Sequence, residues 1–232
     1  FPDRRFVMVD GERSSITVVD QTFSNATTGP ADWLDKTFFQ IEKPNAIEVI
    51  YNGTDSTNSW KLAKASDIAD WKLDGELTEG KELDTAQAPT SALSNPAFND
   101  LANDAEKAAL DKNATQIKIN TSEGFEYVLK VGDSADGSDK IVSVAITANF
   151  PEKRTPAENE SAEDKKKLDE EWVAAQKTLQ DKLANEQKFT QHAYRVSSYT
   201  VDAILKKRSE LIKDEEKGAI TPPPSGNLPI PF

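Results

Sequence analysis

The chain has 232 residues, 37% hydrophobic and 29% charged, a composition typical of a folded domain with a well-hydrated surface. Its formal net charge is −12, from 40 acidic and 28 basic residues, which disfavours nucleic acid and anionic lipid as partners. Cysteine is absent, which excludes disulfides, thiolate metal sites and cysteine catalysis, and suits either a reducing cytoplasm or a bacterial envelope protein.

The first segment is predicted to be a β-hairpin. The runs RFVMVDG and SSITVVD are β-rich, and Asp10-Gly11 at the end of the first run is a pair that favours a tight turn. The chain starts at Phe1 with neither an initiator methionine nor a signal peptide, so we expect a piece of a longer protein with any targeting segment upstream. Within the chain, no apolar run approaches the roughly 20 residues that a membrane-spanning helix needs.

Further strands are predicted at FFQIEK, AIEVIYN and the two repeats of Trp-Lys-Leu that begin at Trp60 and Trp71. The polar stretch between the two repeats is too short for a helix, so the two runs are expected to pair as an antiparallel hairpin with both indoles in or near the core. The alternative is a sugar-stacking platform, which needs both rings exposed. The hairpin is the favoured interpretation.

Short helices are predicted between Asp84 and Leu110, with Pro89 and Pro96 as first helical residues and Asp104 as an N-cap. Strands then resume in three runs, TQIKIN, FEYVLKVGD and KIVSVAITANF, which predict a meander. The loop between the last two runs consists of turn-forming residues.

A long amphipathic helix is predicted over residues 155–191. Thr155-Pro156-Ala157-Glu158 has the pattern of a capping box with proline at the first helical position. Apolar residues then recur at spacings of four and three and form one stripe. We expect this stripe to lie against the body of the protein or against a coiled-coil partner, and its candidate partner-contact residues are Leu168, Trp172, Leu179 and Leu183.

The remainder is predicted to contain a strand at AYRVSSYTV, a helix over residues 200–212 and an extended proline-rich tail over residues 216–232. The expected inner face of that helix comprises Val201, Ile204, Leu205, Leu211 and Ile212. The tail is expected to dock in an apolar groove of its own domain or of a second copy.

Candidate catalytic and metal sites are sparse. The single histidine, His192, lies at a helix-to-strand junction, where a surface or capping role is the favoured interpretation. Asp133, Asp136 and Asp139 offer three carboxylates in one loop for calcium, but their spacing departs from an EF-hand, and a solvated hairpin loop is favoured. No nucleophile elbow, phosphate loop or dinucleotide motif is present. We therefore predict no catalytic residue, metal or cofactor.

Several stretches resemble a bacterial family known only as a domain of unknown function, DUF4340. They are DWLDKTFFQIEK, the paired WKL and DWKL, ELD followed by FNDLAND, and YRVSSYTVDAILKKRSEL, and the resemblance runs from Ala31 to Ile212. It implies a repeating, membrane-anchored envelope protein, of a kind often encoded near gliding-type ABC-transporter components. It implies no catalytic residue.

The expected architecture is an α+β fold with a twisted antiparallel sheet, short packing helices and one long amphipathic helix. Residues 1–36 are expected to close an upstream repeat unit, and residues 37–215 to form the main unit with a helical insertion at 156–190. The expected function is a non-enzymatic interaction module on the extracytoplasmic side of the bacterial envelope, with an unknown protein partner or self-association through the long helix or the tail. The alternative is a module that binds glycan or another extracellular ligand through Trp33, Trp60 or Trp71, and a hydrolytic enzyme ranks last.

Overall fold

A computed structural model describes residues 4–8, 16–20, 29–156 and 160–215. The chain divides into two units, Phe1–Asp35 and Lys36–Phe232, which are treated separately below. The proline-rich tail over residues 216–232, with its predicted docking, lies outside the described residues.

The first unit contains the predicted hairpin. Strands β1 (Arg5–Met8) and β2 (Ile16–Val19) pair antiparallel, with Phe6 opposite Val18 and Met8 opposite Ile16. The pairing is confirmed, whereas the predicted turn at Asp10-Gly11 lies outside the described residues. Cross-strand partners lie on one face of a hairpin, and these four apolar side chains are all exposed. A 3-10 turn, η1 (Pro30–Trp33), follows.

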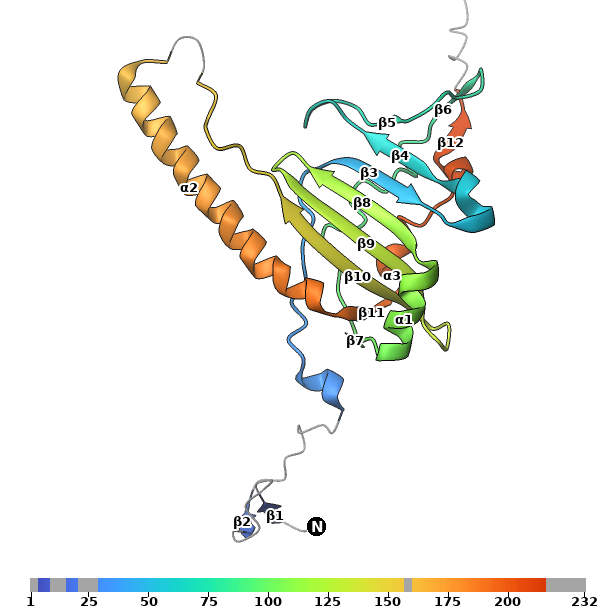
Figure 1. Ribbon diagram of the computed structural model, residues 1–232, viewed down its shortest axis with the longest axis vertical. Helices are drawn as coiled ribbons and strands as arrows, with labels where there is room; N and C mark the ends of the chain where they lie inside the picture. The colour runs from blue at the N-terminus through green and yellow to red at the C-terminus, as the bar shows by residue number, and fades with distance from the viewer. Residues whose placement is uncertain (1–3, 9–15, 21–28, 157–159, 216–232) are drawn as a thin grey trace, which may run out of the picture. The chain divides into compact units, whose positions relative to one another are not determined.

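The second unit is built on an antiparallel sheet, which in the described part of the chain has eight strands in the order β5-β4-β3-β8-β9-β10-β11-β7 (Figure 1). This confirms the predicted α+β class and the predicted meander, which forms β8, β9 and β10. The strands are β3 (Pro44–Ile50), β4 (Trp60–Ala63), β5 (Lys72–Leu73), β7 (Asp100–Leu101), β8 (Thr115–Thr121), β9 (Phe125–Asp133), β10 (Asp139–Ala148) and β11 (Ala193–Ser197).

One face of the sheet carries the main core. The strand registers place one buried residue from each of five neighbouring strands in a single row: Trp60, Val49, Ile117, Leu129 and Val144. This alternation of inward apolar and outward polar residues explains why these runs form strands. The row is a direct consequence of the period-two pattern in the sequence.

Irregular segments cover this face. The strand predicted at FFQIEK is wrong, because this stretch runs beside the sheet without forming a strand. Its residue Phe38 packs its ring on Phe98 and Tyr194 at centroid distances of 5.1 and 4.7 Å. The Ile41 amide donates to the Leu93 carbonyl over 3.3 Å. Together these contacts fasten three distant parts of the chain over one core.

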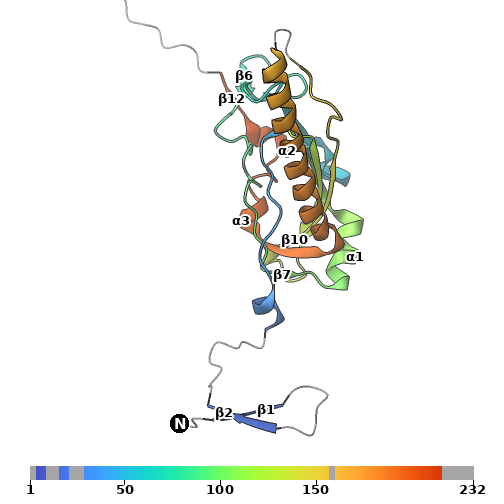
Figure 2. The same ribbon diagram turned by 90° about the vertical axis from the view of Figure 1, so that its left-hand side faces the viewer.

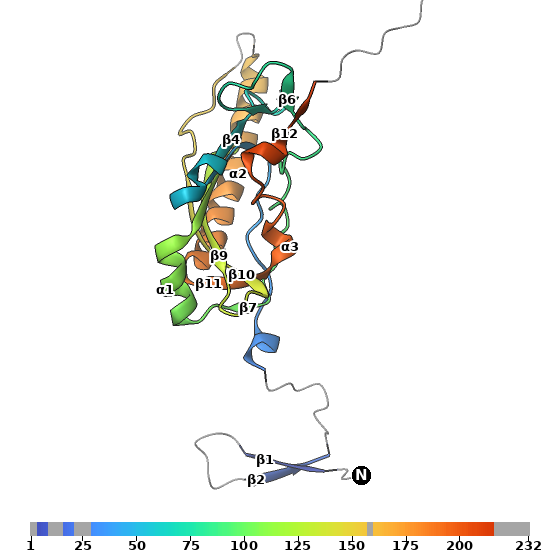
Figure 3. The same cartoon turned by 90° about the vertical axis from the view of Figure 1, so that its right-hand side faces the viewer.

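The opposite face of the sheet is covered at one corner by α1 (Asp104–Asn113), and Figure 3 shows α1 and α3 (Ser198–Val201) on opposite sides of the sheet. Leu110 from α1 packs in a small apolar cluster with Ala114, Ile141 and Ala193. Several outward residues of the central strands, such as Lys118, are polar and half-buried. An antiparallel sheet tolerates such a hydrated face.

The predicted helices before α1 are wrong. The structure has turns from Asp84 to Asn99, and α1 is capped by Asn103, whose side chain forms a capping box with Glu106, so Asp104 is the first helical residue and not the cap. The Leu93 carbonyl binds the Ile41 amide instead of a helical donor. Tertiary hydrogen bonds thus replace the local ones that a helix would need.

The long helix α2 spans Ala162–Glu186 and continues into a 3-10 turn, η3 (Gln187–Gln191). Its predicted start at Thr155 and Pro156 is wrong, because Ser161 is the N-cap and accepts a hydrogen bond from the Asp164 amide. The contacts of Arg154 explain why the helix begins later in the sequence than predicted. Its guanidinium pairs with Glu160 and Asp169, which holds the approaching chain against the first turns of the helix.

The predicted helix over residues 200–212 is also wrong. The segment forms the single turn α3, the 3-10 turn η4 (Arg208–Leu211) and strand β12 (Ile212–Asp214), which pairs with β6 (Lys81–Leu83). The Lys206 carbonyl accepts a 2.6 Å hydrogen bond from Trp60 Nε1, and the Leu205 carbonyl accepts one from the Tyr51 hydroxyl. These carbonyls are therefore committed to distant donors. Among the predicted inner-face residues, three are buried and two half-buried, although the helix is absent: Val201, Ile204 and Leu211, then Leu205 and Ile212.

The predicted strand at residues 193–201 ends at Ser197, where α3 begins. The remaining regular element is the 3-10 turn η2 (Gly53–Asn58), which connects β3 to β4.

Candidate functional site

The helix α2 is the first candidate site, because it is long and almost none of its side chains are buried. Among its residues, all of which the structure describes, Glu186 alone is buried. Figure 1 shows the helix beside the sheet, with its C-terminal end at the sheet and its N-terminal end standing away, and Figure 2 shows it in front of the sheet. A helix of this length normally hides an apolar stripe against a body. The stripe of α2 is only partly hidden.

The predicted contact residues lie along this half-hidden stripe. Leu168 is 36% exposed, while Trp172, Leu179 and Leu183 are half-buried. The structure adds Val173, which is 60% exposed beside Trp172. Sequence periodicity missed Val173 because it lies off the stripe, although an apolar residue among charged neighbours was a visible signal.

The C-terminal end of α2 is fixed by a buried carboxylate. Glu186 Oε1 accepts a 3.0 Å hydrogen bond from the backbone N–H of Gln40, and Oε2 accepts a 2.7 Å bond from the Tyr127 hydroxyl. Burial, reinforced by the hydrogen bond to Glu186, raises the pKa of the Tyr127 phenol, so that group stays protonated and continues to donate. Glu186 therefore ties the last turn of the helix to both β9 and the segment before β3.

A second interaction fixes α2 one helical turn before Glu186. The Lys182 ammonium is 2.6 Å from Glu42 Oε2 and 5.2 Å from the centre of the Phe125 ring. The hydrogen bond and charge of Lys182 lower the pKa of the Glu42 carboxyl. Between these two interactions lies a groove of about 480 Å³, bounded by residues 37–42 on one side and by α2 and η3 on the other.

The three tryptophans proposed for glycan binding have different environments. Trp33 is 71% exposed, Trp71 is half-buried with the Lys64 ammonium 5.4 Å from its ring centre, and Trp60 is buried. Leu62 pairs with Leu73 across β4 and β5, which confirms the predicted hairpin. This register places Trp71 across from Lys64 rather than from Trp60, so the two indoles do not face each other across the strands. Trp60 is not available as a stacking surface.

The loop that contains Asp133, Asp136 and Asp139 is held by hydrogen bonds and ion pairs within the protein. Asp136 Oδ1 accepts hydrogen bonds from the Ser134 hydroxyl and from the Ser138 amide and hydroxyl, and these bonds lower the pKa of the Asp136 carboxyl. Asp133 pairs with Lys140 at 2.6 Å, and Asp139 lies 4.0 Å from Arg195. In the described ranges, no group of three or more acidic or histidine side chains is arranged to hold a metal ion.

Arg195 joins this loop to α1 through Glu106. The guanidinium of Arg195 forms an ion pair with the buried Glu106 carboxylate. Burial raises the pKa of Glu106, but hydrogen bonds from Arg195 and from the backbone N–H of Asn103 outweigh it, so the net pKa is lowered and the carboxylate stays ionised. His192, by contrast, is exposed, with its ring edge-on to Tyr194 at 6.4 Å.

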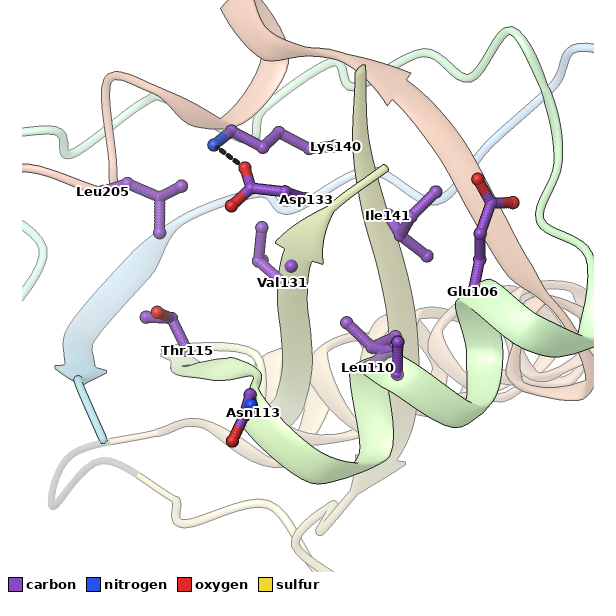
Figure 4. Close-up of a pocket in the computed structure, with 11 residues that line it drawn as sticks. Glu106, Leu110, Asn113, Thr115, Val131, Asp133, Lys140, Ile141 and Leu205 are labelled. Atoms are coloured by element: carbon purple, nitrogen blue, oxygen red, sulfur yellow. Dashed lines mark hydrogen bonds and ion pairs between the residues drawn. The ribbon is translucent and has the colours of Figure 1, made fainter. Parts of the chain in front are cut away.

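A cavity of about 280 Å³ lies beside α1, where β8 begins and β9 ends (Figure 4). Its walls combine apolar and polar side chains, and sequence reasoning missed it because no motif marks it. The lining includes Glu106, Leu110, Asn113, Thr115, Val131, Asp133, Lys140, Ile141 and Leu205.

These features define an α+β domain with a broad antiparallel sheet, a long and mostly exposed helix, and one small mixed cavity beside α1. Residues 1–113, which end with α1, match the family described as Domain of unknown function (DUF4340). This confirms the predicted family resemblance over those residues, and the match begins earlier and ends earlier than the predicted span from Ala31 to Ile212. Searches of curated proteins and of solved structures gave no match. Among the described residues, no helix has the length and apolar character to cross a membrane.

Proposed function

We propose that this chain is a non-enzymatic protein-interaction module of the bacterial cell envelope and that α2 is the element that binds its partner. The single observation that carries the proposal is the exposure of α2, a 25-residue helix in which an apolar stripe is only partly covered. Leaving such surface in water is unfavourable by roughly 25 cal/mol per Å² of apolar area. A partner would remove that cost.

The way α2 is fastened supports this role. Glu186 and Lys182 fix its C-terminal end, and Arg154 fixes its start through Asp169. The helix is therefore presented in one orientation without being buried along its length. A pre-oriented helix loses less conformational entropy on binding than a mobile one.

The partner we propose is an amphipathic helix of another protein. Leu168, Trp172 and Leu179 follow spacings of four and seven residues, which match the periodicity with which two helices interdigitate. Trp172 and Val173 supply the large apolar area that is typical of interface anchors. The charged residues that flank the stripe have both signs, which suits a polar rim.

The cellular setting rests on the family resemblance. It supports an extracytoplasmic position in the bacterial envelope, a membrane anchor upstream of this chain and association with an ABC-transporter assembly. Self-association through α2 is the competing outcome and is distinguished in the same experiment.

The test is site-specific photo-crosslinking in native membranes. A photoreactive amino acid at Val173 is expected to capture a defined partner, and one at Lys61, exposed on β4, is the matched control. Capture at Val173 should be lost in Trp172→Ala protein that melts at the unchanged temperature. A crosslinked dimer of this chain would replace the proposed partner with a second copy. Capture that survives Trp172→Ala, or equal capture at Lys61, would overturn the proposal.

Trp33 favours a second candidate function, the binding of glycan or another extracellular ligand. Its indole is 71% exposed, as sugar stacking requires. The test is calorimetric titration with envelope glycan fragments, in which heat that disappears in Trp33→Ala protein would support this function. Heat that is unchanged in that variant would exclude Trp33 as the binding surface.

A further inference from the structure

Strand β9 extends beyond the start of its neighbour β8, and this leaves an unpaired position at Asp133. In the β8–β9 register, Thr115 lies opposite Val131. Continuing that register by two residues would place Asn113 opposite Asp133. Asn113, however, is the last residue of α1, so no strand partner is present there.

The orientation of the Asp133 backbone follows from its other neighbour. Asp133 lies opposite Lys140 in β10, and the Ser134 amide donates to the Asp139 carbonyl over 3.0 Å. Ser134 therefore directs its backbone N–H toward β10, while its C=O accepts from the Gly137 amide within the loop. Because successive residues of a strand direct these groups to opposite edges, the N–H and C=O of Asp133 point toward the β8 side. No hydrogen bond to them on that side occurs among the described residues.

The cavity beside α1 lies at this position. It is bounded by Asn113 and Thr115, which mark the missing strand partner, and by apolar side chains from α1, β9, β10 and the segment after α3 (Figure 4). The apolar part comprises Leu110, Val131, Ile141 and Leu205. A free donor, a free acceptor and an apolar recess thus meet at one place.

The charges around the cavity are neutralised within the protein. Lys140 pairs with Asp133 at 2.6 Å, and Glu106 pairs with Arg195. A charged ligand would find no unpaired charge among these lining groups, whereas a neutral amide can both accept from the Asp133 N–H and donate to its C=O. The volume, about 280 Å³, is at the low end of the roughly 300–1,000 Å³ of ligand pockets, so the site fits one residue rather than a larger molecule.

The unpaired backbone of Asp133 and the cavity beside it are together called the notch. We propose that this notch binds one residue of an extended peptide. That residue pairs with the Asp133 backbone and places an aliphatic side chain of leucine size in the apolar part of the cavity. This is strand addition reduced to a single residue pair. The site goes beyond the proposed function of α2. It lies beside α1, and none of its lining residues belongs to α2.

The experiment is a titration of ¹⁵N-labelled protein with N-acetyl-leucine methylamide, followed by amide NMR shifts. Saturable shifts are expected at Asp133 and Thr115, with a dissociation constant on the order of 1 mM, as befits so small a ligand. The control ligand, N-acetyl-glycine methylamide, offers the same hydrogen bonds without a side chain and is expected to bind at least tenfold more weakly.

A matched pair of variants tests the position. Ala109→Leu introduces an isobutyl group from an exposed position on the cavity wall and should weaken binding at least tenfold, whereas the exposed neighbour Ala108, one helical step away, should tolerate leucine without effect. Trp172→Ala protein should bind normally, which separates this site from α2. Shifts that are absent, equal for the glycine ligand, or retained in folded Ala109→Leu protein would each overturn the proposal and leave the notch as a site of hydration.

Discussion

The Tyr127 hydroxyl and the Glu186 carboxylate meet over 2.7 Å and join the middle of β9 to the last residue of α2. Both residues are buried, and they are separated by 58 intervening positions in the sequence. Several consequences of this hydrogen bond can be measured.

Replacing the hydroxyl should loosen the base of α2. Tyr127→Phe keeps the ring and leaves one oxygen of a buried carboxylate without its donor, so we expect a loss of about 1–3 kcal/mol in the free energy of unfolding. Urea denaturation measures this loss. Protease cleavage near Phe189 should also accelerate. Tyr194→Phe, in β11 of the same sheet, is the control and should leave cleavage at Phe189 unchanged; equal acceleration in both variants would contradict a specific role for Tyr127.

The two tryptophans of the β4–β5 hairpin should differ in energetic weight. Trp60 is buried and donates to the Lys206 carbonyl, so Trp60→Ala should cost about 3–5 kcal/mol. Trp71 is half-buried at the edge of the sheet, and Trp71→Ala should cost about 1 kcal/mol. Thermal melts of the two variants provide the comparison. Losses of equal size would show that both indoles belong to the core.

The Glu106–Arg195 pair should make stability depend on pH. The pKa of Glu106 is lower in the folded protein than in the unfolded chain, so the pair stabilises the fold above the unfolded pKa, and this stabilisation is lost as the pH falls through the lowered folded pKa. In Glu106→Gln protein, the fall in stability below about pH 4 should be shallower than in the parent protein. Denaturation midpoints between pH 2 and 7 test this, and parallel pH profiles would contradict it.

The two halves of α2 should respond differently to a negative charge. Val173→Asp adds a charge to an exposed position and should change the free energy of unfolding by less than about 0.5 kcal/mol. Leu183→Asp places the charge in the half-buried stretch near the base, where the cost should be about 1–3 kcal/mol. Chemical denaturation measures both values. A large loss in Val173→Asp protein would show that the outer half of the helix is packed.

The sheet could be predicted from the sequence, because apolar and polar residues alternate in runs such as residues 115–121 and 125–133. This alternation is a local property, and it is the pattern of a strand with one buried face. The segment at residues 200–212 could not. Its helical pattern is real, yet the Trp60 indole and the Tyr51 hydroxyl bind its carbonyls, and neither partner is near it in sequence. Burial of Val201, Ile204 and Leu211 was nevertheless predictable, because apolar side chains are buried whatever backbone carries them.

The candidate sites follow the same division. The stripe of α2 could be located by periodicity, which identified Leu168 and Trp172. The role of Glu186 could not, because one acidic residue in a charged helix carries no local mark of a buried partner. The notch at Asp133 was equally hidden, since it depends on the register of β9 against β8 and on the exact end of α1.

Strands β10 and β11 are direct neighbours, paired from Asp139–Ser143 to Ala193–Ser197, and the whole of α2 lies in the connection between them. Two antiparallel neighbours can be joined by a tight turn, so the sheet does not require this long excursion for closure. The helix is in that sense an exchangeable attachment. A chain that replaced it with a short turn would keep its strand order, and a chain that carried a different helix there would present a different surface on the same scaffold.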